Sequence, residues 1–331
     1  MSNNELKVGI VGLGKMGLLH ASILNSTPNV KVSAICETKR LIARFARKVF
    51  DGITVVDKIH EFSNLNLDAI FISTPIPSHL SVINSVYSIG IYNVFTEKTL
   101  AANGEESLRI CQLAQKVSGV NMVGYMARFA VTFQRAKVLL DAGAIGETLS
   151  FKGYAYSSDF IGIPENSVLR GGVVRDLGCH VIDLAMWYFG DLEILTALLE
   201  PCEPVNGESI ASFKVKSAKE VAGEFDVSWC KPGYRIPEYG LVINGKNGSI
   251  EVNNDSIKLI NGDKEETWYR VDLSDNVPFL LGASEYYRED ANFIDAIINK
   301  SPAEPDFVMA SKVDCFIDKA KLLATGGLDN A

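Results

Sequence analysis

The sequence predicts two domains: a doubly wound parallel α/β sheet over residues 1–124, and an α+β domain over residues 125–331 with a large, open, mainly antiparallel sheet. Strand and helix patterns alternate up to about residue 124, which indicates parallel strands joined by crossover helices. From residue 192 onward, strand patterns follow one another across short turns, which favours antiparallel pairing. A length of 331 residues is typical of about two domains.

The first domain alternates apolar strands with amphipathic helices. The expected strands are 7–11, 31–36, 53–56, 68–73, 92–96 and 120–124. The expected helices are 39–49, 78–88 and 105–117, after a first helix whose apolar residues run from Leu18 to Leu24. Right-handed crossovers between parallel strands place all carboxyl ends at one edge of the sheet, where ligands bind in such folds.

The second domain combines helices with a run of strands. Helices are expected at about 131–142, 173–189, 284–299 and 306–324, and strands at 149–156 and between 192 and 271. Apolar residues alternate along one face of that sheet: Ala211, Phe213, Val215, Val221, Phe225, Val227 and Trp229. One face can pack on the domain's own helices. We expect the other to pack on a second copy of the chain, giving a homodimer or homotetramer.

Composition argues against several classes of partner. The net charge is −8 and no basic stripe is visible, so nucleic acid is not expected. No apolar run approaches the roughly 20 residues of a membrane span, and the first residues lack the basic and apolar regions of a signal peptide. Six cysteines occur without a C-x-x-C pair, which is typical of buried thiols in a reducing, cytoplasmic protein rather than of disulfides or a metal site.

The first strand runs directly into a glycine-rich turn, Gly12-Leu13-Gly14-Lys15-Met16-Gly17. Gly12 permits a tight turn, Gly14 lets a phosphate approach the backbone, and Gly17 lets the helix pack closely on the strand. The helix N-terminus then offers free N–H groups to a pyrophosphate. Its place between a strand and a helix supports a dinucleotide-binding loop, with contacts from Lys15 and Met16.

Glu37 ends the second strand and can accept hydrogen bonds from the adenosine ribose, which favours NAD. The alternative is a carboxylate that only stabilises the start of the next helix. Lys39 and Arg40 follow closely and could hold a 2′-phosphate, so NADP stays open.

Two further segments end strands at the same edge. Ser73-Thr74-Pro75, with His79, follows the fourth strand and suits the floor of a nicotinamide pocket; the alternative is an ordinary turn in which Ser78 caps the next helix. Glu97-Lys98 ends the fifth strand. An ammonium group beside a bound cofactor can polarise a substrate oxygen or take part in proton transfer, whereas the alternative is a surface lysine.

The segment from Gly171 to Asp183 is dense in ionisable groups. On a helix, Asp176, His180 and Asp183 are spaced i, i+4, i+7, so they share a face within an apolar run. Such groups are costly to bury unless they are paired or line a site, and a carboxylate can orient and tune a histidine. The alternative is a His–Asp hydrogen bond in the core. A metal site is not expected, because the other histidines lie far away in the sequence.

Taken together, these segments resemble the Gfo/Idh/MocA family, named after glucose–fructose oxidoreductase, inositol dehydrogenase and MocA. The resemblance runs over nearly the whole chain. The matching pieces are Gly12–Gly17 with His20-Ala21, Ser73-Thr74-Pro75 with His79, Glu97-Lys98, Gly124-Tyr125 with Arg128-Phe129, and Gly171–Asp183. Two positions depart from the pattern: Thr99 stands where the family usually has proline, and Ala127 where many members carry a polar residue.

The resemblance implies an N-terminal Rossmann domain, an open C-terminal sheet used in oligomerisation, and hydride transfer between nicotinamide and a hydroxyl or carbonyl of a sugar, polyol or cyclitol. Lys98, Asp176 and His180 match its catalytic residues, and we expect substrate contacts from Arg128 and Tyr156. In the oxidation direction His180 would remove the hydroxyl proton, Asp176 would orient the imidazole, and Lys98 would stabilise the reacting oxygen. The alternatives are a non-catalytic NAD(P)-binding regulator or sensor and an enzyme that interconverts two sugars with tightly held cofactor.

Overall fold

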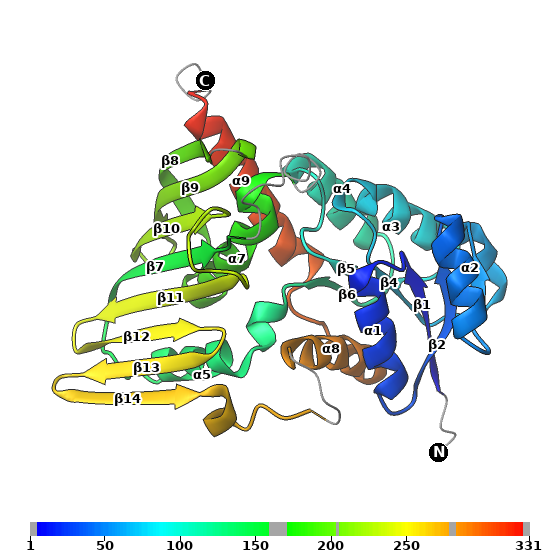
Figure 1. The fold of residues 1–331 in the computed structure, drawn as a ribbon, viewed down its shortest axis with the longest axis horizontal. Helices are drawn as coiled ribbons and strands as arrows, with labels where there is room; N and C mark the ends of the chain where they lie inside the picture. Colours follow the sequence, from blue (N-terminus) through cyan, green and yellow to red (C-terminus); the bar gives the residue numbers. More distant parts are fainter. Residues whose placement is uncertain (1–4, 159–170, 203–204, 278–282, 327–331) are drawn as a thin grey trace. The chain divides into compact units, whose positions relative to one another are not determined.

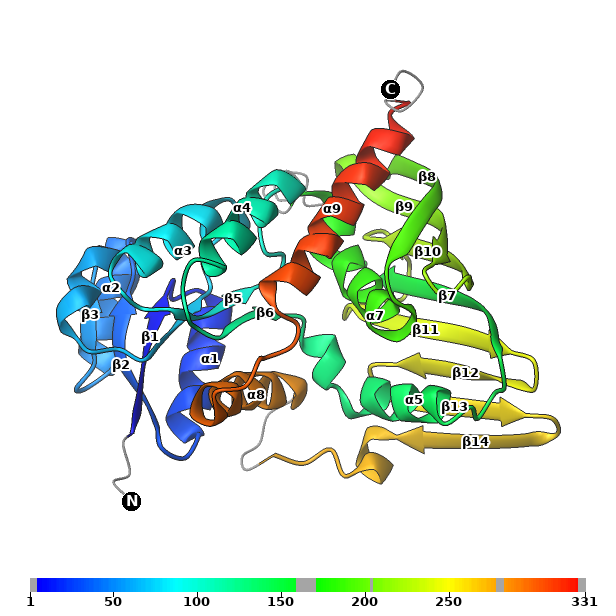
Figure 2. The same ribbon diagram turned by 180° about the vertical axis from the view of Figure 1, so that it is seen from behind.

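A computed structural model of the chain describes residues 5–158, 171–202, 205–277 and 283–326. The chain divides into two compact units (Figures 1 and 2). The first unit holds residues 1–124 and 286–311, and the second holds residues 125–285 and 312–331.

The first unit is built on a six-stranded sheet in the order β3-β2-β1-β4-β5-β6. The strands are β1 (Leu6–Val11), β2 (Val30–Cys36), β3 (Thr54–Val56), β4 (Ala69–Ile72), β5 (Asn93–Glu97) and β6 (Asn121–Gly124). The helices are α1 (Lys15–Ser26), α2 (Arg40–Val49), α3 (His79–Ser88), α4 (Gly104–Ala114) and α8 (Glu285–Asn299). Every strand pairs in parallel with its neighbours, which confirms the predicted doubly wound fold.

Both faces of this sheet are covered by helices. Helices α1 and α8 lie side by side on one face, and α3 and α4 lie on the other (Figure 1). The rings of Phe71 and Phe95 stack at 4.6 Å between centroids, and Phe293 of α8 meets Phe71 edge-on at 5.3 Å. Parallel strands covered in this way are apolar along their whole length, and β4 is buried throughout.

The assignment of α8 differs from the sequence-based division, which placed all residues after 124 in the second domain. Residues 286–311 group with the first unit. Two contacts explain this grouping: Phe293 is fully buried among the rings of the parallel sheet, and Asp290 bonds to His20 of α1. Local sequence patterns do not show that a helix so far along the chain packs back on the first domain.

The second unit contains an eight-stranded sheet in the order β14-β13-β12-β11-β7-β10-β9-β8. The strands are β7 (Thr148–Tyr156), β8 (Leu192–Cys202), β9 (Val205–Ser217), β10 (Ala222–Ser228), β11 (Glu238–Gly245), β12 (Gly248–Asn253), β13 (Ser256–Asn261) and β14 (Lys264–Tyr269). The helices are α5 (Val131–Asp141), α7 (Cys179–Phe189) and α9 (Phe307–Ala324), the last of which belongs to this unit from Lys312 onward. Only β7 and β10 pair in parallel, so the sheet is mainly antiparallel as predicted.

Helices α5, α7 and α9 cover one face of this sheet (Figure 2). On that face Phe151 stacks on Phe189 of α7 at 4.5 Å, and Phe213 meets Phe316 of α9 at 5.9 Å. The opposite face is polar, with Lys152 and Lys214 exposed. The alternation of apolar and polar side chains along each strand produces these two faces.

Candidate active site

The glycine-rich turn between β1 and α1 has the geometry that its sequence predicted. Gly12 has a φ of +90°, and a Cβ there would lie 3.0 Å from the Ser73 carbonyl oxygen. A Cβ on Gly17 would lie 2.0 Å from the Gly12 carbonyl oxygen, so only glycine lets α1 start this close to the strand. A Cβ on Gly14 would meet nothing within 4 Å. The turn is therefore packed at Gly12 and Gly17 and open at Gly14, as close approach of a phosphate requires.

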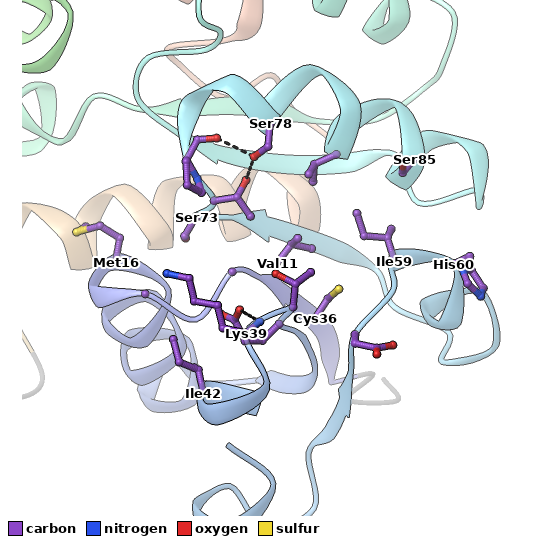
Figure 3. A pocket seen from close by; sticks show the side chains of 18 of the residues that line it. Val11, Met16, Cys36, Lys39, Ile42, Ile59, His60, Ser73, Ser78 and Ser85 are labelled. Atoms are coloured by element: carbon purple, nitrogen blue, oxygen red, sulfur yellow. Dashed lines mark hydrogen bonds between the residues drawn. The ribbon is translucent and has the colours of Figure 1, made fainter. Parts of the chain in front are cut away.

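A cavity of about 820 Å³ opens beside this turn, at the carboxyl edge of the parallel sheet, and its size is typical of a cofactor site. Ser73 and Ser78 lie on one side of it, and Lys39 and Ile42 on the other (Figure 3). Eight of the predicted cofactor residues line it: Gly12, Gly14, Lys15, Met16, Glu37, Ser73, Thr74 and Pro75. The cavity thus brings together the dispersed motifs of the first unit.

Glu37 is fixed at this cavity by two backbone groups. Its Oε2 accepts a hydrogen bond from the Leu13 N–H at 2.9 Å, and its Oε1 accepts one from the Lys39 N–H at 2.7 Å. Each carboxylate oxygen can accept a further bond, so the side chain keeps capacity for ribose hydroxyls. The carboxylate joins the glycine-rich turn to the start of α2.

The Ser73-Thr74-Pro75 turn offers a polar atom to the cavity. The Ser73 hydroxyl is buried and has no partner among the residues that the structure describes. The Ser78 hydroxyl donates to Pro75 O at 2.7 Å and lies 2.8 Å from Thr74 Oγ1 (Figure 3). A buried hydroxyl usually finds a partner, so Ser73 fits a site that a ligand completes.

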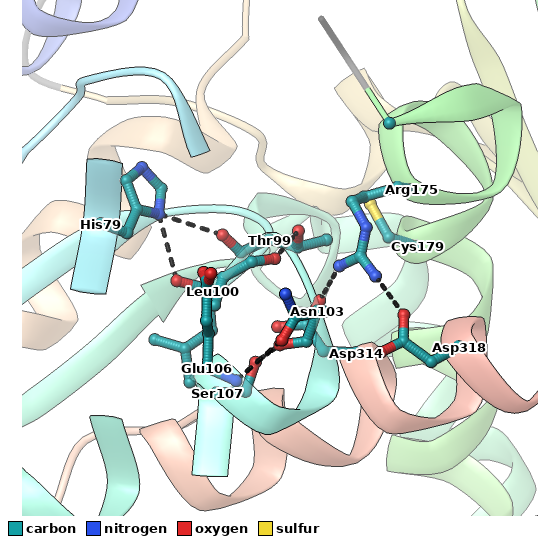
Figure 4. Close-up of polar contacts among 12 residues, drawn as sticks. His79, Thr99, Leu100, Asn103, Glu106, Ser107, Arg175, Cys179, Asp314 and Asp318 are labelled. Atoms are coloured by element: carbon teal, nitrogen blue, oxygen red, sulfur yellow. Dashed lines mark hydrogen bonds and ion pairs between the residues drawn. The ribbon is translucent and has the colours of Figure 1, made fainter. Parts of the chain in front are cut away.

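His79 supports this turn instead of lining the cavity. It is fully buried, with Nε2 2.9 Å from Thr74 O and Nδ1 3.1 Å from Thr99 O. Figure 4 shows its bonds to the Thr99–Leu100 segment. Burial lowers the pKa of His79 despite these carbonyl contacts. Gly17, Glu97 and Lys98, also predicted as cofactor residues, do not line the cavity either.

Sequence reasoning missed one wall of the cavity. Ser78, Val82, Ser85 and Ile89 line it along α3, at the spacing i, i+4, i+7, i+11. That spacing places the four residues on one face of a helix. The stripe of serine and apolar residues could therefore have indicated a helix face that lines a ligand cavity. Thr38, Asp57 and His60 also line the cavity.

Lys98 follows β5 at the carboxyl edge and is half-buried. The Lys98–Thr99 peptide bond is cis. Thr99 is fully buried, and its hydroxyl donates to Ala101 O at 3.1 Å. The helix that follows, α4, is capped by Asn103, whose side chain accepts from the Glu106 N–H (Figure 4).

In the second unit, the helix that carries Asp176 and His180 is not regular. A π turn over Val174–Gly178 precedes α7, where a single α-helix was expected. Turns of this kind occur often at functional sites. Asp176 is half-buried on the π turn. His180 is buried, stacked on Tyr239 with ring centroids 4.9 Å apart and edge-on to Tyr125 at 6.4 Å, so two rings fix the imidazole plane.

The start of this helix is held from α9 and β9. The Arg175 guanidinium bonds to Asp314 and, at 2.8 Å, to Asp318 (Figure 4). Glu208 Oε1 accepts from the Val174 N–H at 2.8 Å, and Lys321 pairs with Glu208 at 2.9 Å. These ion pairs, which the sequence did not reveal, anchor the backbone on which Asp176 stands.

The two residues predicted to contact substrate lie in different surroundings. Arg128 is buried and paired with Asp183. The Tyr156 hydroxyl bonds to Asp226 at 2.6 Å on the polar face of the sheet, whereas α7 packs on the other face. The second unit therefore does not bring Tyr156 and His180 together. Burial, followed by the bond to Asp226, raises the pKa of Tyr156 well above its ordinary value.

Lys98 belongs to the first unit, and Asp176 and His180 belong to the second, so their convergence stays a prediction. The described residues contain no group of three or more His, Cys, Asp or Glu side chains that could hold a metal ion. In the same residues no helix is both long and apolar enough to cross a membrane.

Two models of one known family match this chain. Residues 6–125 match a model described as an oxidoreductase family with an NAD-binding Rossmann fold, GFO_IDH_MocA, and residues 133–251 match the GFO/IDH/MocA C-terminal domain. The chain belongs to the Gfo/Idh/MocA family. The matched N-terminal model is an NAD-binding Rossmann fold, and the open loop at Gly14 and the buried Ser73 hydroxyl beside the cavity fit that cofactor.

Relatives within the family are dehydrogenases of cyclitols and sugars. A scyllo-inositol 2-dehydrogenase (NAD(+)) of Bacillus subtilis is 27% identical over 191 residues, which cover 56% of this chain and 55% of the relative. A levoglucosan dehydrogenase of Pseudarthrobacter phenanthrenivorans is 27% identical over 245 residues, covering 67% of this chain and 62% of the relative. The alignment thus spans little more than half the length of these curated relatives.

Two solved structures share the fold over nearly the whole length of the chain. A levoglucosan dehydrogenase in complex with NADH and levoglucosan superposes with a TM-score of 0.87, at 22% identity, covering 97% of this chain and 98% of that one. The WlbA dehydrogenase of Bordetella pertussis, in complex with NADH and UDP-GlcNAcA, gives a TM-score of 0.85 at 15% identity, covering 99% of this chain and 98% of that one. At these identities the likeness shows the fold alone.

Proposed function

We propose that this protein is an NAD-dependent oxidoreductase that transfers hydride between nicotinamide and a secondary hydroxyl or carbonyl of a sugar, polyol or cyclitol. The observation that carries the proposal is the cavity at the Gly12–Gly17 turn, where Glu37 and Ser73 present polar groups to a dinucleotide. Family relatives that oxidise inositols and levoglucosan support the substrate class.

Three residues of this chain would carry the chemistry. When bound, NAD supplies the hydride acceptor or donor. In the oxidation direction, His180 takes the proton of the substrate hydroxyl, and the Tyr239 ring holds the imidazole plane for this transfer. Asp176 orients and charge-stabilises the imidazole, and the Lys98 ammonium donates a hydrogen bond to the reacting oxygen.

The proposal is tested by a spectrophotometric screen for reduced nicotinamide with scyllo-inositol, myo-inositol, levoglucosan and common aldoses, using NAD and NADP in parallel. We expect turnover with NAD, and a loss of about 10²–10⁴-fold in both His180→Ala and Lys98→Ala. Arg109→Ala, which removes an exposed ion pair on α4, is the control and should keep full activity. NADH binding without turnover on any substrate would instead indicate a regulator or sensor.

We also propose that the chain forms a homodimer or homotetramer. The face of the large sheet opposite its helices carries the stacked rings of Tyr154 and Tyr156, 5.1 Å apart, which offer apolar surface for packing on a second copy of the chain. Light scattering after size-exclusion chromatography measures the mass directly. A monomeric mass at micromolar concentration would exclude the oligomer.

A further inference from the structure

A second cluster of ionisable groups lies in the first unit, outside the cavity. His20 of α1 places Nε2 3.0 Å from Glu97 Oε1 and Nδ1 2.8 Å from Asp290 Oδ1. His20 and Asp290 are fully buried, and the Glu97 side chain is only 13% exposed. Residues 77 and 270 positions away in the sequence thus meet on one imidazole.

The hydrogen bonds define the charge of this cluster. An ionised carboxylate only accepts hydrogen bonds, so an imidazole between two carboxylates donates from both nitrogens and is an imidazolium. Burial disfavours that charge, but the charges and hydrogen bonds of Asp290 and Glu97 outweigh it, and the pKa of His20 lies well above its ordinary value. Burial also raises the pKa of Asp290, although the charge and the hydrogen bond of His20 oppose this rise.

The surroundings of His20 are aromatic. Its ring centroid lies 5.1 Å from that of Phe95, 5.6 Å from Phe71 and 6.4 Å from Tyr286 of α8. Glu97 and Asp290 are the charged groups that face it from β5 and α8. In such surroundings a charge without its partners is costly, so each member of the cluster depends on the other two.

The cluster reaches the backbone of Lys98 through Glu97. Glu97 Oε2 accepts a hydrogen bond from the Lys98 N–H at 3.2 Å, while Oε1 is held by His20. Gly124 of β6 lies opposite Glu97 of β5. The two residues are so close that a Cβ added to Gly124 would lie 3.4 Å from the same Oε2. The Glu97 carboxylate is thus fixed on both oxygens, directly before the residue proposed to contact substrate.

We propose that His20 and Asp290 are positioning residues for Lys98. The imidazolium, clamped by Asp290, holds the Glu97 carboxylate, and that carboxylate fixes the Lys98 N–H and so the place where the lysine side chain leaves the backbone. The inference rests on the proposed catalytic role of Lys98. It explains why α8 groups with the first unit: the helix supplies the carboxylate that completes the cluster.

A double-mutant cycle on the full-length enzyme tests this coupling, with the best substrate of the screen above. His20→Gln should lower kcat by about 10- to 100-fold, since a displacement of about 1 Å costs on the order of 10²-fold, while the NADH dissociation constant changes less than about twofold. In the Lys98→Ala background, His20→Gln should cause almost no further loss, because the residue it positions is absent. A merely structural role would instead multiply the two losses, and that result would overturn the inference.

Two further variants complete the design. Asp290→Asn keeps the shape of the side chain and one oxygen acceptor but removes the charge that clamps His20. If His20→Gln does not fold, Asp290→Asn takes its place in the double-mutant cycle. Asp295→Asn makes the same chemical change at an exposed position on α8, and should leave kcat and thermal stability unchanged.

Nuclear magnetic resonance of enzyme labelled with ¹⁵N in its histidine rings needs no substrate. The His20 signals, assigned by their loss in His20→Gln, should show both ring nitrogens protonated above the ordinary histidine pKa of about 6.5. A neutral His20 ring in that range would overturn the inference. If instead Lys98→Ala retains wild-type turnover, the proposed function fails on its own, whatever the state of His20.

Discussion

Arg128 and Asp183 form a buried, bidentate ion pair in the second unit. Arg128 Nε lies 2.7 Å from Asp183 Oδ2, and Nη2 lies 2.6 Å from Oδ1. The guanidinium also lies 5.7 Å from the centre of the Trp187 ring. Burial raises the pKa of Asp183, although the Arg128 charge opposes this. The pair ties the segment after β6 to α7, the helix that carries His180.

We expect the protein to lose more stability when one partner of the pair is replaced than when both are replaced by apolar residues. Arg128→Met or Asp183→Leu alone should lower the free energy of unfolding by about 3–5 kcal/mol, because each leaves a buried charge without its partner. The double variant should recover most of that loss. All three tryptophans lie in the second unit, so urea unfolding followed by tryptophan fluorescence reports on it. A double variant no more stable than the single ones would contradict this account.

The glycine-rich turn allows folding and cofactor binding to be separated. Gly14→Ala meets no atom within 4 Å, and its backbone φ of −76° suits any residue. We expect its stability to stay within about 0.5 kcal/mol of wild type, while the added methyl group blocks the phosphates and weakens NADH binding at least about tenfold. Gly17→Ala drives its Cβ to 2.0 Å from a backbone oxygen and should lose about 1–3 kcal/mol of stability. Thermal unfolding and NADH titration distinguish the two variants.

The parallel sheet and most of its cavity could be predicted because they depend on local patterns. Strand and helix periodicity set the topology, and each motif ends a strand at the same edge, so Gly12, Glu37 and Ser73 necessarily meet at one cavity. The second sheet was equally visible in its alternation of apolar and polar residues.

What the sequence did not reveal depends on partners far apart along the chain. His20 bonds to Asp290, 270 residues away, and the sequence around His20 does not indicate this partner. No local pattern distinguishes a buried paired histidine from a buried packed one. The π turn shifts the register assumed for the i, i+4, i+7 face, and Asp183 bonds to Arg128. Tyr156 was expected to contact substrate, but it lies on the face of the sheet opposite α7, and only the packing of the helices reveals that separation.

Glu37 should govern the choice of nicotinamide cofactor. Glu37→Gln removes a negative charge and replaces one acceptor oxygen with an NH₂ group, so one of the bonds from Leu13 N–H and Lys39 N–H is lost. NADH should bind more weakly, and the ratio of NADPH to NADH dissociation constants should fall at least about tenfold, because repulsion of a 2′-phosphate is relieved. Glu105→Gln, which changes an exposed carboxylate on α4, is the matched control. If the ratio of NADPH to NADH dissociation constants is unchanged in Glu37→Gln, Glu37 only holds the backbone of the turn and does not select the cofactor.

The charge of His20 should appear in the pH dependence of stability. The pKa of His20 is raised in the folded state. The stability that His20 contributes is therefore fully present below its pKa in the unfolded chain, about 6.5, and is lost as the pH rises through its pKa in the folded chain. Between those values the folded chain binds a proton that the unfolded chain has released, and each pH unit removes about 1.4 kcal/mol. Wild type and the His20→Gln/Asp290→Asn double variant, compared by urea unfolding with circular dichroism, should therefore converge in stability from neutral to alkaline pH. A gap that stays constant over that range would mean that the His20 imidazole is neutral, and would contradict the proposed imidazolium clamp on Glu97.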